Sequence, residues 1–282
     1  MAAILNLLNH FFDFIWIPLS KTSCYIDFSI FSAISAVIFL FLFKLASNQE
    51  KIKQFKNILF AHILEIRLYK DQPSLTLKII IDILVKNLTY LRYTIVPIFV
   101  ILPFVLIISI QLNNRYGYLP IKKGNTFIVR AALNKRLATD IAKNPDKIRC
   151  EASKGILIET PPIFVESEAS IYWRAKVIGS GNDQQYCRII LDGTSYGVKK
   201  KILTKLSKQR FSPERQKYNI EGLLIDSSED FISKTSPFEA VSINYHRATY
   251  PFLFWNMDPI VLYFVLTLIL GLVIKPFIKV NI

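Results

Sequence analysis

The chain has 282 residues, of which 52% are hydrophobic, and it carries a formal net charge of +14. Three stretches of at least 16 residues contain no charge, which excludes an ordinary soluble protein and predicts an integral membrane protein. Nucleic acid is excluded as a partner because Lys and Arg form no compact cluster beside stacking aromatic residues, so the positive charge favours anionic membrane lipids.

Residues 1–20 are predicted to form an amphipathic helix on the outer face of the membrane. The polar residues of this segment recur three or four positions apart and share one side of a helix: Asn6, Asn9, His10 and Asp13. Apolar residues cover the rest, and Pro18 is expected to end the helix. Such a stripe is typical of a face toward lipid headgroups; a proton or metal site at His10 and Asp13 is the alternative.

Three membrane-spanning helices are predicted at residues 28–45, 93–112 and 258–277. The hydrocarbon core of a bilayer is roughly 30 Å thick and needs about 20 helical residues. The middle span meets this length. The two outer spans reach full depth only if Lys44 and Lys275 extend toward the headgroups, or if the bilayer thins around them.

The orientation of the chain follows from the charges that flank the spans. Residues 44–92 contain nine Lys or Arg against four Asp or Glu, and positive flanks stay in the cytoplasm. We therefore expect this loop and the tail at residues 278–282 to be cytoplasmic. Alternation places the N-terminus and residues 113–257 outside.

Residues 46–92 are predicted to form a cytoplasmic helical hairpin. Apolar residues at helical spacing occur on both sides of a turn that ends at Pro73. The two halves are too apolar to stand alone in water. We expect the hairpin to pack flat on the membrane or over the inner mouth of the three-span bundle.

Residues 113–257 are predicted to form a mostly β, sandwich-like domain of the immunoglobulin type. Alternating apolar and polar residues indicate strands at 127–131, 155–160, 163–166, 169–178, 185–191, 196–203 and 239–245. Residues 131–142 and 213–218 are predicted to be short helices or loops.

Cys150 and Cys187 both lie in this domain, each with apolar residues two positions away. An oxidising envelope permits a disulfide between them. Two buried thiols fit the sequence equally well, because disulfide geometry is not readable from it.

Three stretches resemble a group of bacterial three-span membrane proteins: SNQEKIKQFKNILFAHILEIRLYKDQP, QLNNRYGYLPIKKGN and FVLTLILGLVIKPF. The order of an outer N-terminus, a span, a basic cytoplasmic hairpin, a second span and a later third span resembles the YidC/Oxa superfamily of membrane protein insertases. The resemblance implies the inner membrane of a bacterium as the location. The chain departs from that pattern in two ways. A large domain separates the second and third spans, and no arginine lies inside a span, whereas many bacterial members have a buried cation there.

The resemblance implies a groove that accepts hydrophobic segments, and polar residues within the spans are the candidates for its lining. A polar side chain at membrane depth is costly without a partner or a wet cavity. The candidates are Ser35, Gln111 and Thr267, with Lys44 and Arg92 at the cytoplasmic entrance. The alternatives are hydroxyls that bond to their own helix or mediate helix packing, and a Gln111 at the membrane interface.

No enzyme chemistry, metal or cofactor is predicted. His10, His62 and His246 are scattered, and no zinc, nucleophile-elbow or phosphate-loop motif occurs. Two functions are weighed: a membrane protein insertase or chaperone that meets nascent membrane proteins, and a membrane-anchored envelope protein whose β domain binds a partner. A transporter is a third, which three uncharged spans do not favour.

Overall fold

The computed structural model describes residues 2–19, 22–69, 71–179, 184–194, 196–205, 208–217 and 229–280. The chain forms two compact units. The β unit comprises Met1–Thr22 and Ile110–Ile260, and the helical unit comprises Ser23–Ser109 and Val261–Ile282.

Three helices are long and apolar enough to cross a membrane: α2 (Cys24–Ala46), α4 (Pro73–Tyr116) and α7 (Pro259–Ile278). The predicted spans at residues 28–45 and 93–112 lie inside α2 and α4, and the third is shifted from α7 by one residue. The chain is therefore a membrane protein with three candidate spans.

Helix α4 is the longest element and runs without a break for 44 residues, about 66 Å at 1.5 Å per residue. Pro73 occupies its first position, where a backbone N–H has no helical partner and its loss costs little. Pro97 and Pro103 lie inside the helix without ending it. The predicted boundary between hairpin and second span at residue 92 is therefore not a structural boundary.

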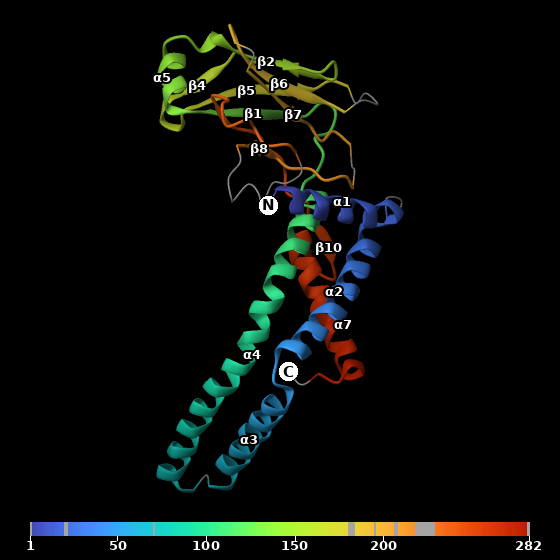
Figure 1. Cartoon of the computed structure of the whole chain (residues 1–282), viewed down its shortest axis with the longest axis vertical. Helices are drawn as coiled ribbons and strands as arrows, with labels where there is room; N and C mark the ends of the chain where they lie inside the picture. The colour runs from blue at the N-terminus through green and yellow to red at the C-terminus, as the bar shows by residue number, and fades with distance from the viewer. Residues whose placement is uncertain are drawn as a thin grey trace. The chain divides into compact units, whose positions relative to one another are not determined.

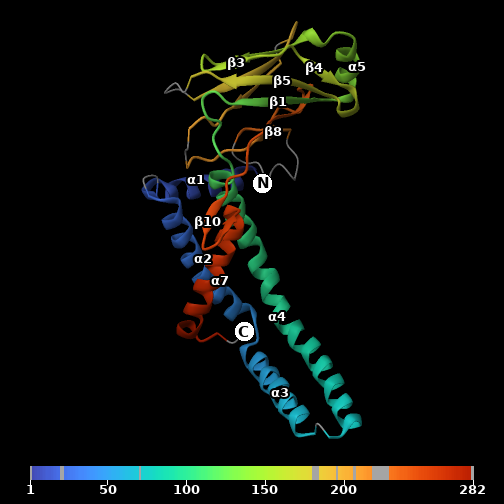
Figure 2. The same cartoon turned by 180° about the vertical axis from the view of Figure 1, so that it is seen from behind.

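Helix α3 (Gln49–Leu68) and the first half of α4 form the predicted helical hairpin. At its base, Leu40 and Phe43 of α2 pack with Ile52 and Val280, and the rings of Phe55 and Tyr93 stack at 5.6 Å. Within the helical unit, the rest of the hairpin extends beyond the ends of α2 and α7 (Figures 1 and 2). It does not fold over the mouth of the bundle, because the unbroken α4 carries it away.

Two antiparallel sheets form the body of the β unit. The first has the order β3-β5-β1-β9-β8, with β4 also paired to β5, and the second has the order β2-β6-β7. The strands are β1 (Thr126–Leu133), β2 (Ile148–Ala152), β3 (Ile156–Ile158), β4 (Ile163–Val165), β5 (Ser170–Val177), β6 (Tyr186–Leu191), β7 (Gly197–Lys201), β8 (Glu214–Gln216) and β9 (Phe238–Ile243).

The inward residues of both sheets join one hydrophobic core, as a sandwich-like domain requires. Val129, Ile171 and Trp173 of the first sheet share it with Ile189 and Val198 of the second. The immunoglobulin-like type is wrong, since the strand order differs from that fold. Residues 213–218 contain strand β8 instead of a helix or loop, because they extend the edge beside β9.

The remaining elements are α1 (Ala2–Leu19), α5 (Lys135–Lys143), the short helices η1 (Pro145–Lys147) and η2 (Glu166–Glu168), and a separate hairpin of β10 (Tyr250–Phe252) and β11 (Trp255–Met257). Helix α1 matches the predicted amphipathic helix at residues 1–20, although Pro18 lies inside it.

Candidate functional site

Two of the five predicted groove residues come together between α2 and α7. Ser35 and Thr267 are both buried, and Thr267 Oγ1 donates to Tyr263 O at 2.7 Å. Ser32 Oγ of α2 donates to the same carbonyl oxygen at 3.2 Å. These hydroxyls therefore satisfy helix backbone and mediate packing between two spans.

The other three predicted residues have separate environments. Lys44 Nζ donates to Ile278 O at 2.9 Å and so caps the last turn of α7. Arg92 is exposed on α4. Gln111 belongs to the β unit, where it is buried and holds Arg115.

The hairpin carries a large apolar surface that nothing in the described chain covers. On α4 the exposed apolar residues recur along one side at three- and four-residue steps: Leu77, Ile80, Ile81, Leu84, Val85, Leu88 and Leu91. On α3 the exposed members are Ile58, Phe60, Ile63, Leu64 and Leu68. We call these twelve residues the hairpin surface.

The hairpin surface is additional to the seam between the two helices. A different set of residues is buried or half-buried along the hairpin: Ile52, Phe55, Leu59 and Ile66 of α3, and Ile79, Ile83 and Tyr90 of α4. Apolar residues therefore occupy more than one side of each helix. An amphipathic helix that only formed a hairpin would need one such side.

Basic residues accompany the hairpin surface along its whole length. The exposed cations of the two helices are Lys51, Lys53, Lys56, Arg67, Lys78, Lys86 and Arg92. Each Lys or Arg close to an anionic membrane surface contributes about 1 kcal/mol of attraction. The hairpin thus combines apolar side chains with charges that favour the vicinity of a membrane.

The length of α4 sets how far the hairpin surface lies from the hydrocarbon core. Twenty residues of α4 precede the charge-free stretch at residues 93–114, which is about 30 Å along the helix axis. Even at a tilt of 40° this leaves about 23 Å along the membrane normal. The headgroup layer adds only about 5 to 8 Å on each side of the core. With the charge-free stretch taken as the membrane span, most of the hairpin surface falls outside the combined thickness of core and headgroups.

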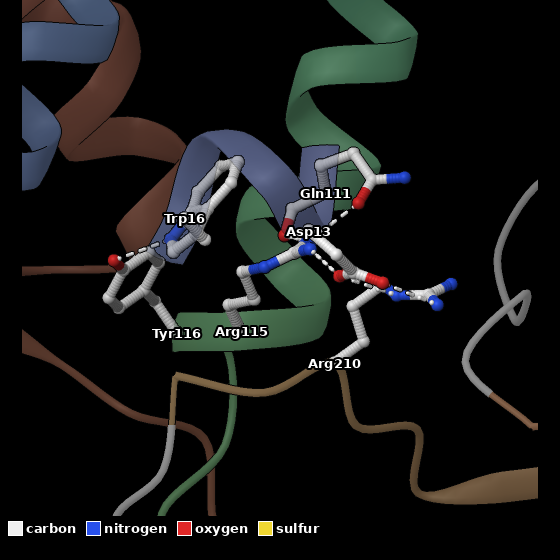
Figure 3. Close-up of polar contacts among 6 residues, drawn as sticks. All are labelled: Asp13, Trp16, Gln111, Arg115, Tyr116 and Arg210. Carbon is white, nitrogen blue, oxygen red and sulfur yellow. Dashed lines mark hydrogen bonds and ion pairs between the residues drawn. The ribbon is translucent and has the colours of Figure 1, made fainter. Parts of the chain in front are cut away.

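A second feature, a buried polar cluster, lies in the β unit where α1 meets the last turn of α4 (Figure 3). The side chain of Arg115 is 1% exposed, and its Nη2 lies 2.5 Å from Asp13 Oδ1. Its Nη1 donates to Gln111 Oε1 at 2.6 Å. Arg210 contacts the other side of Asp13, with Nη2 2.9 Å from Oδ2.

Aromatic residues complete this cluster. The guanidinium carbon of Arg115 lies 4.2 Å from the centre of the Trp16 ring, a cation–π contact. Trp16 Nε1 donates to Tyr116 Oη at 2.9 Å. Arg115 is therefore held by a carboxylate, an amide and an indole at once (Figure 3).

A neighbouring lysine fixes the end of α1. Lys208 Nζ donates to the carbonyl oxygen of Leu19, the last residue of α1, at 2.5 Å, and to Thr22 O at 2.7 Å. Two residues on, Arg210 reaches Asp13, and Phe211 N donates to Asn114 O at 2.7 Å. Residues 208–211 thus clamp α1 and the end of α4 to the β sheets.

The cluster corrects the sequence interpretation of residues 1–20. Asp13 belongs to an ion-pair network and not to a stripe that faces headgroups, because two arginines distant in sequence reach it. The spacing of Gln111 and Arg115, four residues apart on one helix, is the local signal that was available. The arrangement positions elements; it presents no nucleophile or acid–base pair.

Cys150 and Cys187 are free thiols on neighbouring strands. Cys150 is paired in register with Ile189, and Cys187 with Ala152, so the two cysteines are diagonal neighbours on the inner face of the second sheet. The hydrogen bond with Cys150, together with burial, raises the pKa of the Cys187 thiol.

Comparisons with family models, with curated proteins and with solved structures gave no match. Function is therefore inferred from the residues and their geometry.

Proposed function

We propose that this protein is a membrane insertase or chaperone that guides hydrophobic segments of other proteins into the bilayer. The observation that carries the proposal is the uncovered hairpin surface on a helix continuous with a membrane span. An exposed apolar patch of this extent normally marks an interaction site.

The position of the hairpin surface favours a hydrophobic protein segment as its ligand. Apolar surface left in contact with water costs about 25 cal/mol per Å² relative to burial. Lipid tails do not reach most of the surface, because the first 20 residues of α4 stand outside the charge-free stretch. A nascent apolar helix would cover the hairpin surface by packing its apolar face against α3 and α4.

The direction of transfer follows from the continuity of α4. A segment bound at Leu77 or Leu84 lies against the same helix that enters the bilayer after Arg92. The ligand would remain next to apolar side chains as it moves toward the hydrocarbon core. The positive flanks of the hairpin support a cytoplasmic site, where newly made segments emerge. The resemblance to bacterial three-span membrane proteins supports the bacterial inner membrane as the protein's location.

Photocrosslinking in living cells tests the proposal. A photoreactive residue replaces either Leu84 or Leu88. The cells are irradiated while they synthesise a model membrane protein. Lys86 is the matched control, since it lies on the same stretch of α4, is also exposed and points to the other side of the helix. We expect crosslinks to the nascent apolar segment from 84 and 88 and few from 86.

The same experiment at Ser35, Gln111 and Thr267 examines the groove implied by the sequence. Crosslinks from these positions to the nascent segment would extend the binding path into the bundle. Lipid adducts alone at all five positions would contradict an insertase.

The second candidate is a membrane-anchored envelope protein whose β domain binds a partner. It is favoured by the seam between α2 and α7, where the hydroxyls of Ser32 and Thr267 donate to Tyr263 O and so mediate packing between two helices. Stable crosslinks from the β unit to one envelope protein, with none from the hairpin surface, would support this candidate over the first.

A further inference from the structure

The hairpin of β10 and β11 has an unusual turn. Phe252 pairs with Trp255, so Leu253 and Phe254 form a two-residue turn, and Leu253 has φ of 53° in the left-handed region. Turns of this length normally use Gly, Asn or Asp, because these residues tolerate positive φ. The Leu-Phe pair lacks this tolerance and places two large apolar side chains at the tip of the hairpin.

The tip is among the most exposed apolar features of the described chain. Leu253 is 77% exposed, Phe254 is 92% exposed and Trp255 is 67% exposed. The hairpin is a separate two-stranded sheet with three residues in each strand. Two-stranded hairpins are at best marginally stable in water, so this one requires an apolar contact outside itself.

The hairpin is attached to the ends of two candidate membrane spans, α7 through the chain and α4 through a hydrogen bond. Met257 is followed by Asp258 and then by Pro259, the first residue of the apolar helix α7. Phe254 is four residues from Asp258, at most about 13 Å along an extended strand. At its other end, Tyr250 Oη donates to the carbonyl oxygen of Tyr116, the last residue of α4.

Helix α1 presents a second apolar set in the same unit. Its inner side buries Phe12, Trp16 and Leu19, whereas Phe11, Phe14 and Ile17 are exposed at three-residue steps. The hairpin lies on the opposite side of α1 from the sheets in both views (Figures 1 and 2). The tip is therefore directed away from the domain that would otherwise cover it.

We propose that Leu253, Phe254 and Trp255 insert into the bilayer leaflet at which α7 begins, and that the hairpin is a monotopic anchor beside the spans. Lipid is the ligand that fits, because the tip carries no charge and is fixed to the ends of two membrane-spanning helices. Tyr250 at the base of the hairpin and Trp255 beside its turn are of the residue types enriched where the bilayer meets water. This inference is independent of the insertase proposal.

Fluorescence quenching of Trp255 in the full chain, reconstituted in lipid nanodiscs, tests the anchor. The emission of Trp255 is obtained by subtracting a W255F variant from the wild type, since Trp16 and Trp173 are buried in the protein. Lipids brominated on their acyl chains report contact with the bilayer, and iodide reports contact with water. Phe254→Trp in the W255F chain repeats the measurement at the turn.

We expect brominated lipids to remove most of the Trp255 emission and iodide to remove little. The matched control is Leu157→Trp in the W255F chain, at an exposed position on β3, which should show the reverse. Quenching of Trp255 by iodide and not by brominated lipid would mean that the hairpin stands in water. Protection from both quenchers would mean that a protein covers it. Either result overturns the proposal.

Discussion

Arg115 is a cation withdrawn from water whose stability depends on its neighbours. Burial of an unpaired charge costs several kcal/mol, and the cost is offset only when hydrogen bonds and an opposite charge are in place. Asp13, Gln111 and Trp16 supply these contacts from α1 and α4. Arg210 shares the same carboxylate, so two arginines depend on one aspartate.

Asp13→Asn should destabilise the β unit by about 2 kcal/mol, less than a fully buried ion pair would lose, because the Asp13 side chain is 42% exposed. The substitution leaves two neighbouring arginines without their anion. Thermal unfolding of the purified full chain measures the loss.

Asp192→Asn is the matched control for that substitution. Asp192 pairs with Arg149 at 2.8 Å, but both side chains are exposed. We expect a cost below about 1 kcal/mol. Equal effects of the two substitutions would show that the polar cluster is no more than a surface contact.

The thiol content provides a second test at this scale. Burial and the raised pKa of Cys187 leave little thiolate, so this residue should resist alkylation in the folded chain near neutral pH. After denaturation without reductant, mass spectrometry should find three alkylated cysteines. A single alkylated cysteine, Cys24, would mean instead that Cys150 and Cys187 are bridged.

Local periodicity predicted most elements, and long-range contacts decided the rest. All seven predicted strands exist, because alternating burial is written into runs such as residues 169–178. Strands β2, β8, β10 and β11 were not predicted. The three residues of β8 carry no alternation and pair only because β9 lies beside them. The helical spacing of apolar residues at 75–91 runs into the second span, and α4 is continuous there, because charge marks a membrane boundary without ending a helix.

Gly155 is a position where the sandwich requires the absence of a side chain. A Cβ there would lie 2.5 Å from Gly179 O, a backbone atom that cannot move freely. Gly155→Ala should therefore lower stability by about 1 to 3 kcal/mol, typical of overpacking. Gly271→Ala on α7 meets nothing within 4 Å and should cost nothing measurable. A neutral Gly155→Ala would contradict the close approach of these strands.

The candidate sites were only partly visible in the sequence. The hairpin was recognised as apolar and basic, but which sides stay uncovered depends on how α3 packs on α4. The polar cluster joins Asp13 to partners 102 and 197 residues away, and no local pattern encodes such distances. Ser35 and Thr267 are polar residues that the sequence places within spans, and their shared neighbour Tyr263 emerged only from the fold.

Topology is a prediction for the whole molecule. The positive-inside rule places the hairpin turn near Asp71 in the cytoplasm and the β sheets outside. Single cysteines introduced at Asp71 and at Lys176 of β5, in a chain whose three native cysteines are replaced by serine, should respond oppositely to a membrane-impermeant maleimide added to intact spheroplasts. Only the cysteine at 176 should be labelled. Labelling at Asp71 would show that the chain has the opposite orientation, with the hairpin outside the cell and out of reach of segments that emerge in the cytoplasm.

Insertion by purified protein in proteoliposomes tests the central claim most directly. A small membrane protein is synthesised in the presence of vesicles that contain the wild type, a Leu84→Asp/Leu88→Asp variant, or a Lys86→Asp control, and protease-protected product is measured. The account predicts insertion with the wild type and the control, and its loss with the double variant at unchanged thermal stability. Equal insertion with all three proteins would contradict the account. Insertion into empty vesicles at the level of the wild type would also contradict it.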